Sequence, residues 1–369
     1  MASPQRVRKT LALLGLYCLV CAAIDCKSVY IQSQGDADAL QSCETIAGSV
    51  TISKSYRGDL TLPGVKSIQG SLTTEPCQSD SSTDTSDWQT DPPDFRNLVL
   101  NNCSGLAHFV APDLNQVSQD VVLIAQLNLT SVTLPKLKWV GTTFSLDGMP
   151  ELASVSVPSL LGFGRFNLFY TPKLQNLEVP QHQAQSLGSI SIGYTGLDDL
   201  GSLFLWSTRY DSVALSGLSN ASQLYINTTG TFRSLDITGN GLLAVHATQS
   251  GVTVGSLSVA GAGSLTTQPW NVASFSAVGN TFSRLDITAI QGIENLDVRD
   301  NAYMELLGLP QGQNWTNVAI TGNPVLDPGS AVGHFDITTF LGATGSASAA
   351  QFPSASSFEF EGPFRTEFL

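Results

Sequence analysis

A short stretch of alternating apolar and polar residues recurs throughout the chain. It reads SLDITGN at 234–240, SFSAVGN at 274–280, NLDVRDN at 295–301 and NVAITGN at 317–323. Similar stretches begin at residues 49, 71, 97, 121, 143, 166, 189, 212 and 256, and most steps are 22–24 residues. Such a period is typical of a solenoid in which each turn adds one short strand to a parallel sheet. At about 4.8 Å per strand, thirteen turns make a rod on the order of 60 Å long.

The alternation predicts which side chains face inward. In SLDITGN, Leu235 and Ile237 point to one side of the strand and Asp236 and Thr238 to the other. The apolar pair must face the interior, so every unit has an outward position at its centre. These predicted outward residues are Thr51, Thr73, Val99, Val122, Ser145, Asn167, Ser191, Ala214, Asp236, Ser258, Ser276, Asp297 and Ala319.

Asparagine ends several of the repeated strands. The positions are Asn240, Asn280, Asn301 and Asn323, and Cys103 takes the place in an earlier unit. A buried amide can satisfy the backbone groups of a sharp turn and tolerate turn geometry, so we interpret these residues as structural and not as ligands. The pattern is an irregular form of the leucine-rich repeat.

Further strands are expected within the units, at 59–65, 131–137 and 154–160. Each carries proline directly after an apolar residue, which suits strand ends, so each turn should have two or three faces. Residues 78–96 are polar and acidic and are expected to form a loop inserted in a solenoid of residues 24–340. Residues 341–369 begin as a flexible Gly/Ala/Ser tail, and their final FEFEGPFRTEFL would either cover the last turn or hang free.

Composition supports β structure. Only 13% of the 369 residues are charged, whereas 33 are glycine and 42% are hydrophobic.

The start of the chain predicts a signal peptide of residues 1–23, because a basic stretch with Arg6, Arg8 and Lys9 precedes the apolar run 11–23. An uncleaved anchor is the alternative. Removal of the signal peptide takes the net charge from −13 to −16, which disfavours nucleic acid as a partner. No transmembrane segment is expected in the mature chain.

Four cysteines remain after the leader, namely Cys26, Cys43, Cys77 and Cys103. An even number in a secreted chain favours two disulfides, of three possible pairings. We expect Cys26 to pair with Cys43 and Cys77 with Cys103, because neighbouring pairs close short loops near an end that needs support.

Five N-glycosylation sequons also indicate a secreted chain. They begin at Asn102, Asn128, Asn220, Asn227 and Asn314.

The stretch CKSVYIQSQGDADALQSCETIAGSVTIS, residues 26–53, resembles the fungal cell-wall organisation and sporulation proteins that carry a glycosylphosphatidylinositol anchor. In that family two cysteines bracket a DADAL-like helix before a first strand of the GSV type, and the later units here, to about residue 340, are similar in rhythm. The resemblance implies an all-β solenoid like the L domains of growth-factor receptors, with a short helical cap. It also implies a non-catalytic role in cell-wall integrity at the cell surface. The expected partners are wall polysaccharide or surface proteins, with no cofactor and a monomeric chain.

Two hypotheses compete with this one: a soluble extracellular module that binds a specific protein, and a β-helical enzyme that acts on polysaccharide. Glycosidases need two carboxylates about 5–9.5 Å apart. Asp236 and Asp297 occupy the outward row about three turns apart, which is too far for one glycosidic bond, and Asp198 and Asp199 form a turn pair that we interpret as solvated. His108, His182, His246 and His334 are scattered without metal-ligand spacing. We therefore expect no catalytic or metal site.

The resembled family implies a hydrophobic C-terminal tail that is exchanged for the lipid anchor. Here the last twelve residues contain Glu359, Glu361, Arg365 and Glu367, a charge density unsuited to that signal. The sequence as written therefore predicts a protein that is released or held non-covalently in the wall, with a truncated gene model as the alternative.

Overall fold

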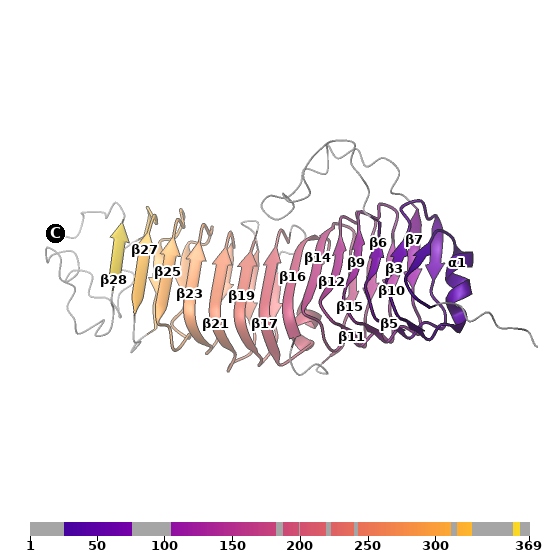
Figure 1. Ribbon diagram of the computed structural model, residues 1–369. Coiled ribbons are helices and arrows are strands. Elements are labelled where there is room, and N and C mark those ends of the chain that lie inside the picture. The colour runs from indigo at the N-terminus through magenta and orange to yellow at the C-terminus, as the bar shows by residue number, and fades with distance from the viewer. Residues whose placement is uncertain are drawn as a thin grey trace, which may run out of the picture.

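The computed structural model describes residues 26–75, 105–181, 187–198, 200–218, 223–239, 243–310 and 316–326, together with the backbone of 357–361. These residues form a parallel β-solenoid, as the sequence predicts, and the strands stack in chain order along a rod (Figure 1).

One sheet of fourteen parallel strands, the large sheet, runs the whole length of the rod. Twelve of its strands coincide with predicted repeat units. In spatial order the strands are β1 (Val29–Ile31), β3 (Val50–Ile52), β6 (Leu72–Thr74), β9 (Val121–Ile124), β12 (Thr143–Asp147), β14 (Arg165–Thr171), β16 (Leu187–Thr195), β17 (Arg209–Ser216), β19 (Thr231–Thr238), β21 (Thr253–Ala260), β23 (Asn271–Val278), β25 (Asn295–Arg299), β27 (Asn317–Thr321) and β28 (Ser357–Glu361).

Three smaller parallel sheets complete the cross-section. A four-stranded sheet contains β2 (Thr45–Ile46), β5 (Ser67–Ile68), β8 (Gln116–Val117) and β11 (Trp139–Val140). A first five-stranded sheet contains β4 (Gly58–Thr61), β7 (Leu106–Val110), β10 (Ser131–Thr133), β13 (Ser154–Ser156) and β15 (Asn176–Glu178). A second contains β18 (Gln223–Ile226), β20 (Ala244–Ala247), β22 (Ser264–Thr266), β24 (Arg284–Asp286) and β26 (Leu306–Gly308). The N-terminal part of the rod thus has three faces and the C-terminal part has two.

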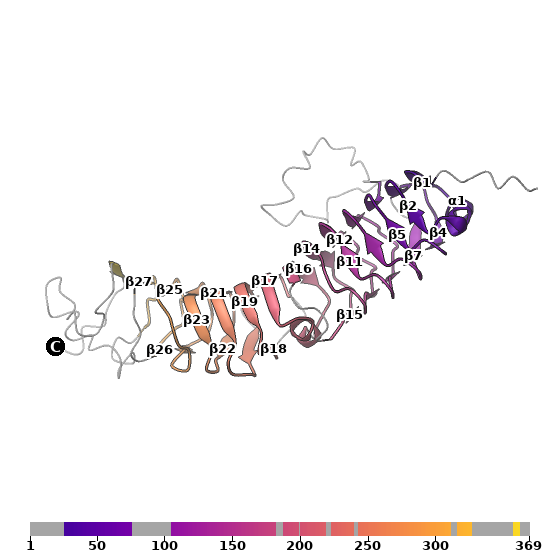
Figure 2. The ribbon, with the colours of Figure 1, turned by 60° about the horizontal axis from the view of Figure 1, so that its bottom comes forward.

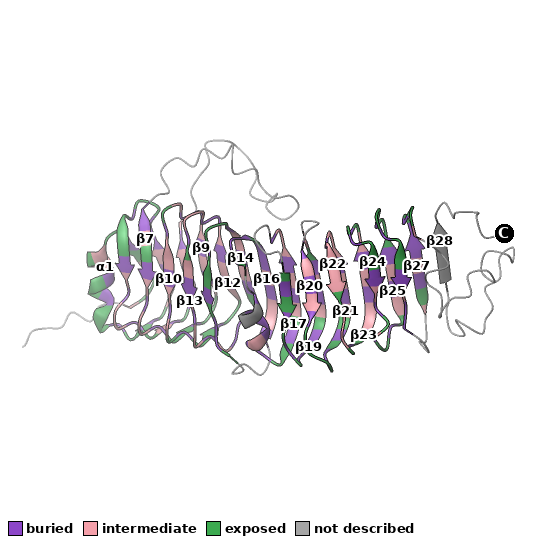
Figure 3. Cartoon of the chain, turned by 180° about the vertical axis from the view of Figure 1, so that it is seen from behind, coloured by how far each residue is buried: buried purple, intermediate pink, exposed green. Residues whose placement is uncertain are grey.

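The alternation of the repeat fixes the side-chain directions. Leu235 is fully buried and Ile237 is 1% exposed, whereas Asp236 between them is half-buried on the outside. The same alternation of buried and more exposed positions runs through the strands in Figure 3. Pro63, Pro135 and Pro158 follow β4, β10 and β13 closely, where the missing N–H removes no ladder hydrogen bond.

The prediction of a strand at residue 97 in this series is wrong. β6 pairs directly with β9, with Leu72 opposite Val121 and Thr73 opposite Val122, so no strand stands between them. The step from β6 to β9 is about twice the usual length but makes only one turn, through β7 and β8. An apolar pair alone therefore did not identify a strand of the sheet. The predicted loop 78–96, Val99 and Cys103 all lie outside the described residues.

Both ends of the large sheet extend beyond the predicted repeats. β1 precedes the first unit, and α1 (Gln34–Asp38) with the 3-10 helix η1 (Ala39–Ser42) follows it. Ser33 caps α1 with a capping box to Asp36, and Ala37 and Leu40 are buried against the first turn. At the other end β28 pairs in parallel with β27, so the final FEFE segment adds a strand.

The predicted disulfide between Cys26 and Cys43 is confirmed. It joins the start of the described chain to the end of η1, with Cα atoms 5.9 Å apart, and Cys43 is buried. Cys77 and Cys103 lie outside the described residues, so their pairing stays a prediction.

The asparagines are buried, as the sequence predicts, and they also form a ladder of side-chain hydrogen bonds that joins the last turns, which the sequence did not predict. Asn280 Nδ2 donates to Asn301 Oδ1 at 3.0 Å, and Asn301 Nδ2 donates to Asn323 Oδ1 at 3.0 Å. The same amides donate to backbone carbonyls of Val259, Ala277 and Val298. Asn240 lies outside the described residues.

The expectation that asparagine itself adopts the turn geometry needs correction. The left-handed residue is the one before it, namely Gly279, Asp300 and Gly322 with φ of 62°, 56° and 65°. This residue turns the chain, and the asparagine that follows can then direct its amide into the interior, where it satisfies backbone groups.

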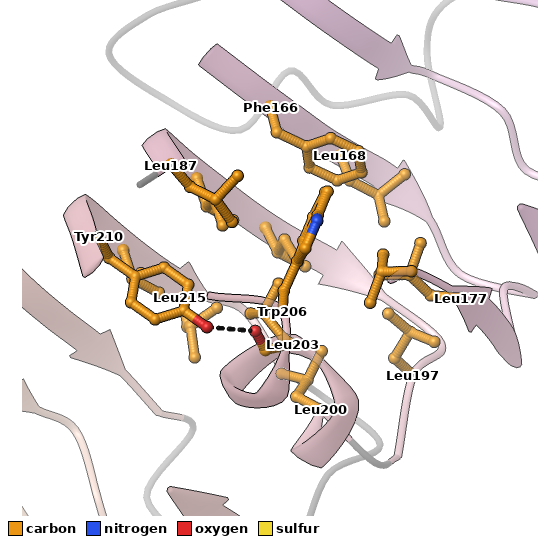
Figure 4. Close-up of a cluster of buried hydrophobic side chains, with 14 of the residues drawn as sticks. Phe166, Leu168, Leu177, Leu187, Leu197, Leu200, Leu203, Trp206, Tyr210 and Leu215 are labelled. Atoms are coloured by element: carbon orange, nitrogen blue, oxygen red, sulfur yellow. Dashed lines mark hydrogen bonds between the residues drawn. The ribbon is translucent and has the colours of Figure 1, made fainter. Parts of the chain in front are cut away.

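The rod bends where the cross-section changes, near β16 and β17 (Figure 2). The 3-10 helix η3 (Gly201–Leu205) connects these two strands. Trp206 follows it, is fully buried, and donates from Nε1 to the carbonyl of Leu160 at 2.8 Å. Tyr210 donates its hydroxyl to the carbonyl of Leu203 at 2.9 Å (Figure 4). Burial raises the pKa of Tyr210 to about 12.

Candidate functional site: the outer face of the large sheet

The outward central positions form one continuous register row along the large sheet. Apart from Val99, every residue predicted for this row is in it, from Thr51 opposite Thr73 to Asp297 opposite Ala319. Tyr30 on β1 and Glu359 on β28 extend the row at its two ends. The side chains are mostly small and uncharged, so this face offers hydrogen-bonding groups but little charge.

A second row, one pleat before the central row, is more uniform. From β16 to β27 its members carry a hydroxyl or an amide; they are Ser189, Ser212, Ser234, Ser256, Ser274, Asn295 and Asn317. We call it the hydroxyl row. Neighbouring side chains lie one strand apart, about 4.8 Å. This row was not predicted from the sequence, although serine or asparagine opens most of these units.

A basin of about 650 Å³ lies on this face between β21 and β27. Its polar lining includes Ser256, Ser274 and Ser276 together with Asn295 and Asn317. Asn317 Nδ2 donates to Asn295 Oδ1 at 2.6 Å, which ties the two amides together. Asp297 and Arg299 form a two-bond ion pair in the wall. The basin can accept and donate many hydrogen bonds.

Aromatic side chains gather on the same face over β14 and β16. We define the aromatic cluster as Phe169, Tyr170 and Tyr194. The rings of Tyr170 and Tyr194 stack with centroids 4.9 Å apart and 6° between their planes. Phe169 and Tyr170 are tilted by 42° with centroids 6.4 Å apart. Tyr194 is 39% exposed, so the cluster is open to solvent.

Both tyrosines occupy a position that usually carries glycine. Tyr170 and Tyr194 have φ of 52° and 53°, in the left-handed region, where Gly148 and Gly217 stand in the flanking turns. A residue with a side chain costs about 1–2 kcal/mol in this conformation. Tyr194 is exposed and Tyr170 is half-buried, and such strain near the surface is a reason to look for function.

Glycines in the following turn make room for these rings. A Cβ atom on Gly193 would lie 2.6 Å from Cε1 of Phe169, and one on Gly217 would lie 2.6 Å from Cδ1 of Tyr194. The rings therefore lean along the rod and cover the next turn. In the sequence this arrangement is an aromatic residue followed one period later by glycine, a signal that could have revealed the cluster.

Asp147 lies beside the aromatic cluster and was missed by sequence reasoning. It is opposite Ile124 on one side and Phe169 on the other. Its Oδ1 atom is buried and has no hydrogen-bond partner within the described part of the chain. Burial among these neighbours raises the pKa of the Asp147 carboxyl to about 6, against a smaller lowering by the N–H of Gly148. Burial raises the pKa of Tyr170 to about 12, with smaller contributions from the charges of Tyr194 and then Asp147.

The predicted separation of Asp236 and Asp297 agrees with the register. They stand in one row on β19 and β25, with Ser258 and Ser276 between them. Three strand spacings amount to about 14 Å, beyond the roughly 9.5 Å over which two carboxylates cooperate on a glycosidic bond. Asp198 is exposed, and Asp199 lies outside the described residues.

The histidines that the structure describes have other partners. His108 Nδ1 lies 2.8 Å from Ser131 Oγ, and His246 stacks on Tyr225 with centroids 5.1 Å apart. His182 and His334 lie outside the described residues. Within the described ranges, no group of three or more His, Cys, Asp or Glu residues could hold a metal ion.

Two of the five sequons fall on described residues. Asn227 is exposed directly after β18, and its Oδ1 accepts from Gln249 Nε2 at 3.1 Å. Asn128 lies in the corner between β9 and β10. Asn102, Asn220 and Asn314 lie outside the described residues. Glycosylation at all five stays a prediction.

Comparison with known proteins finds two related fungal sequences. The protein ecm33 of Aspergillus fumigatus is 27% identical over 220 residues, which is 57% of this chain and 42% of the relative. This chain is similar in sequence to fungal Ecm33 proteins. The cell wall protein ecm33 of Schizosaccharomyces pombe is 26% identical over 137 residues, 34% of this chain and 31% of the relative.

The chain spans less than half the length of each of these Ecm33 relatives. No family model matches the chain, and no solved structure matches it. The Ecm33 similarity nevertheless agrees with the family resemblance noted in the sequence. None of the described helices has the length and apolar character needed to cross a bilayer.

Proposed function

We propose that this protein is a secreted, N-glycosylated component of the fungal cell wall that contributes to wall organisation and integrity without catalysing a reaction. The observation that carries the proposal is the similarity to Ecm33 proteins, one of which is named a cell wall protein. The solenoid would serve as a rigid scaffold with a long, weakly charged outer face. Its expected location is the wall or the extracellular space, and its expected partners are wall polysaccharides or surface proteins.

The shape of the molecule supports a scaffold. A single sheet of fourteen strands presents one register row over the full length of the rod, a surface suited to an extended partner. The carboxylate spacing on this face does not favour the competing enzyme hypothesis. A secreted chain also agrees with the disulfide between Cys26 and Cys43.

Deletion of the gene in the native host tests the proposal. We expect the deletion strain to grow poorly on wall-stressing dyes and the intact gene to restore growth. A deletion strain with normal growth and normal wall composition would contradict the wall role.

An assay on glucan, chitin and pectin tests the absence of catalysis. We expect the purified protein to release neither reducing ends nor unsaturated products. Robust turnover that is abolished by Asp236→Asn or Asp297→Asn would refute the non-catalytic assignment.

A further inference from the structure

We propose that the aromatic cluster of Phe169, Tyr170 and Tyr194 is a binding site for an extended, uncharged, β-linked polysaccharide that lies along the outer face of the large sheet. The inference rests on the proposed function, since it names the class of partner for the face described above. It goes further because it assigns the binding to particular residues.

The ring of Phe169 provides the flat apolar surface that such a ligand needs. It covers Gly193, where a Cβ atom would come within 2.6 Å of Cε1 and 2.9 Å of Cδ1. The ring is therefore supported by the sheet on one side, and Phe169 is half-buried, so part of the ring is accessible to the C–H face of a sugar. Aromatic rings supply apolar contact at low conformational cost because they have few rotatable bonds.

The stacked tyrosines stand beside this surface and mark one edge of the site. Tyr194 lies between Tyr170 and Gly217, so the pair is held by ring stacking on one side and by a glycine on the other. Their left-handed backbone conformation costs free energy that the flanking glycines avoid. The two tyrosines line this edge of the site with phenol groups, which both donate hydrogen bonds to and accept them from sugar hydroxyls. Sugar binding therefore gives a functional reason for tyrosine at these strained positions.

Hydrogen-bonding side chains flank the rings on the other edge. Ser145, Asn167 and Ser191 are neighbours in the central row, and all three are half-buried. The equatorial hydroxyls of a sugar that rests on Phe169 would point toward this row. An apolar platform with a few polar groups at its border is the usual composition of small-molecule sites.

The repeat of the solenoid favours an extended polymer over a single sugar. The hydroxyl row, which begins at Ser189 opposite Arg165, runs two pleats from the row of Phe169 and leads to the basin at Ser256 and Ser274. Its spacing of about 4.8 Å is close to the length of one unit in an extended β-linked glycan. A chain that follows the row of the rings would pass Ser216 and reach the basin at Arg299, with the polar side chains of the central row alongside it.

Charge argues against an anionic ligand. In the central row, the hydroxyl row and the row of Asp147 and Phe169, the basic side chains between β12 and β27 are Arg165 and Arg299. Arg299 is already paired with Asp297. Asp147 adds a carboxyl group next to the rings, and the whole chain has a net charge of −13. A neutral glycan needs no cation for recognition.

Binding of the secreted, full-length chain to insoluble β-glucan, chitin and cellulose tests the inference. We expect retention on at least one of them, and we expect Phe169→Ala and Tyr194→Ala each to weaken binding by about tenfold. Tyr194→Phe keeps the ring and should retain binding within about threefold. Tyr303→Ala is the matched control, because it removes a ring that is 64% exposed outside the large sheet.

Circular dichroism and thermal unfolding show whether each variant is folded, and the soluble fragments of the bound polysaccharide give the affinity. If Phe169→Ala or Tyr194→Ala is unfolded, Gly193→Phe provides a second test. The new side chain at position 193 must displace the Phe169 ring, so we expect this variant to lose binding. Lack of binding to all three polysaccharides by folded wild-type protein would overturn the inference. So would equal binding by wild type, Phe169→Ala and Tyr194→Ala. Restoration of wall growth by a chain that binds no polysaccharide would overturn this inference and leave the proposed function intact.

Discussion

At the scale of single residues, Asp147 gives the structure a dependence on pH. Its pKa is raised from 3.8 to about 6, so between these values the folded protein keeps a proton that the unfolded chain has lost. Stability contributed by the neutral carboxyl is therefore present below about pH 4 and is lost as pH rises toward 6. The loss is on the order of 2–3 kcal/mol at neutral pH.

Asp147→Asn is expected to remove this dependence, because the amide is neutral at every pH. The variant should exceed wild type in free energy of unfolding at pH 7.5 and resemble it at pH 4, as measured by chemical denaturation at both values. A difference of the same size at the two pH values would show that ionisation is not its cause.

Asn301 is the central member of the asparagine ladder. Its Oδ1 accepts from the N–H and the Nδ2 of Asn280, and its Nδ2 donates to Ala277 and Asn323. Asn301→Ala should destabilise the last turns by about 2–4 kcal/mol, because it leaves buried polar groups without partners. Hydrogen exchange of β23, β25 and β27 measures the effect. Asn295→Ala, on the outer surface, is the control and should change exchange little.

At the scale of the elements, β18 presents a sequon in a favourable setting. Tyr225 and Asn227 point to the same side of the strand, and both are exposed. The ring of Tyr225 stacks on His246, and Gln249 Nε2 donates a hydrogen bond to Asn227 Oδ1. We expect an N-glycan at Asn227 whose first sugar packs on the ring of Tyr225.

Tyr225→Ala should therefore lower the melting temperature of the glycosylated protein more than that of enzymatically deglycosylated protein. The ring contact is worth about 1 kcal/mol. Glycopeptide mass spectrometry establishes occupancy, and thermal unfolding before and after deglycosylation measures the coupling. An unmodified Asn227 in secreted material, or an equal loss in both forms, contradicts this prediction.

At the scale of the whole molecule, the two parts of the rod meet at Trp206. The buried indole packs on Phe166 edge to face with centroids 5.3 Å apart, and on Phe163 at 5.1 Å. It also bonds to the carbonyl of Leu160, in an earlier turn. These contacts join the three-faced part to the element that begins the two-faced part.

Trp206→Ala is expected to cost about 3–5 kcal/mol at this junction, through a cavity and an unsatisfied carbonyl. Because each turn contacts mainly its neighbours, weakening one interface should separate unfolding into two transitions. Differential scanning calorimetry checks this. Trp139→Ala removes an indole that is 53% exposed and should keep the wild-type profile. A single transition at wild-type temperature in Trp206→Ala would show that the junction does not couple the two parts.

The sequence by itself determined the solenoid, the inward apolar pairs, the outward central row apart from Val99, the burial of the turn asparagines and the Cys26–Cys43 pair. Each follows from local periodicity or from neighbours in the chain, since the strand period of two fixes side-chain direction wherever a strand exists. The tertiary structure alone decided that β6 pairs with β9 and that the rod bends at η3. It also decided that Asp147 lies against Phe169. These features depend on which turns are stacked and on how far a ring leans over the next turn, and neither is set by the residues of one repeat.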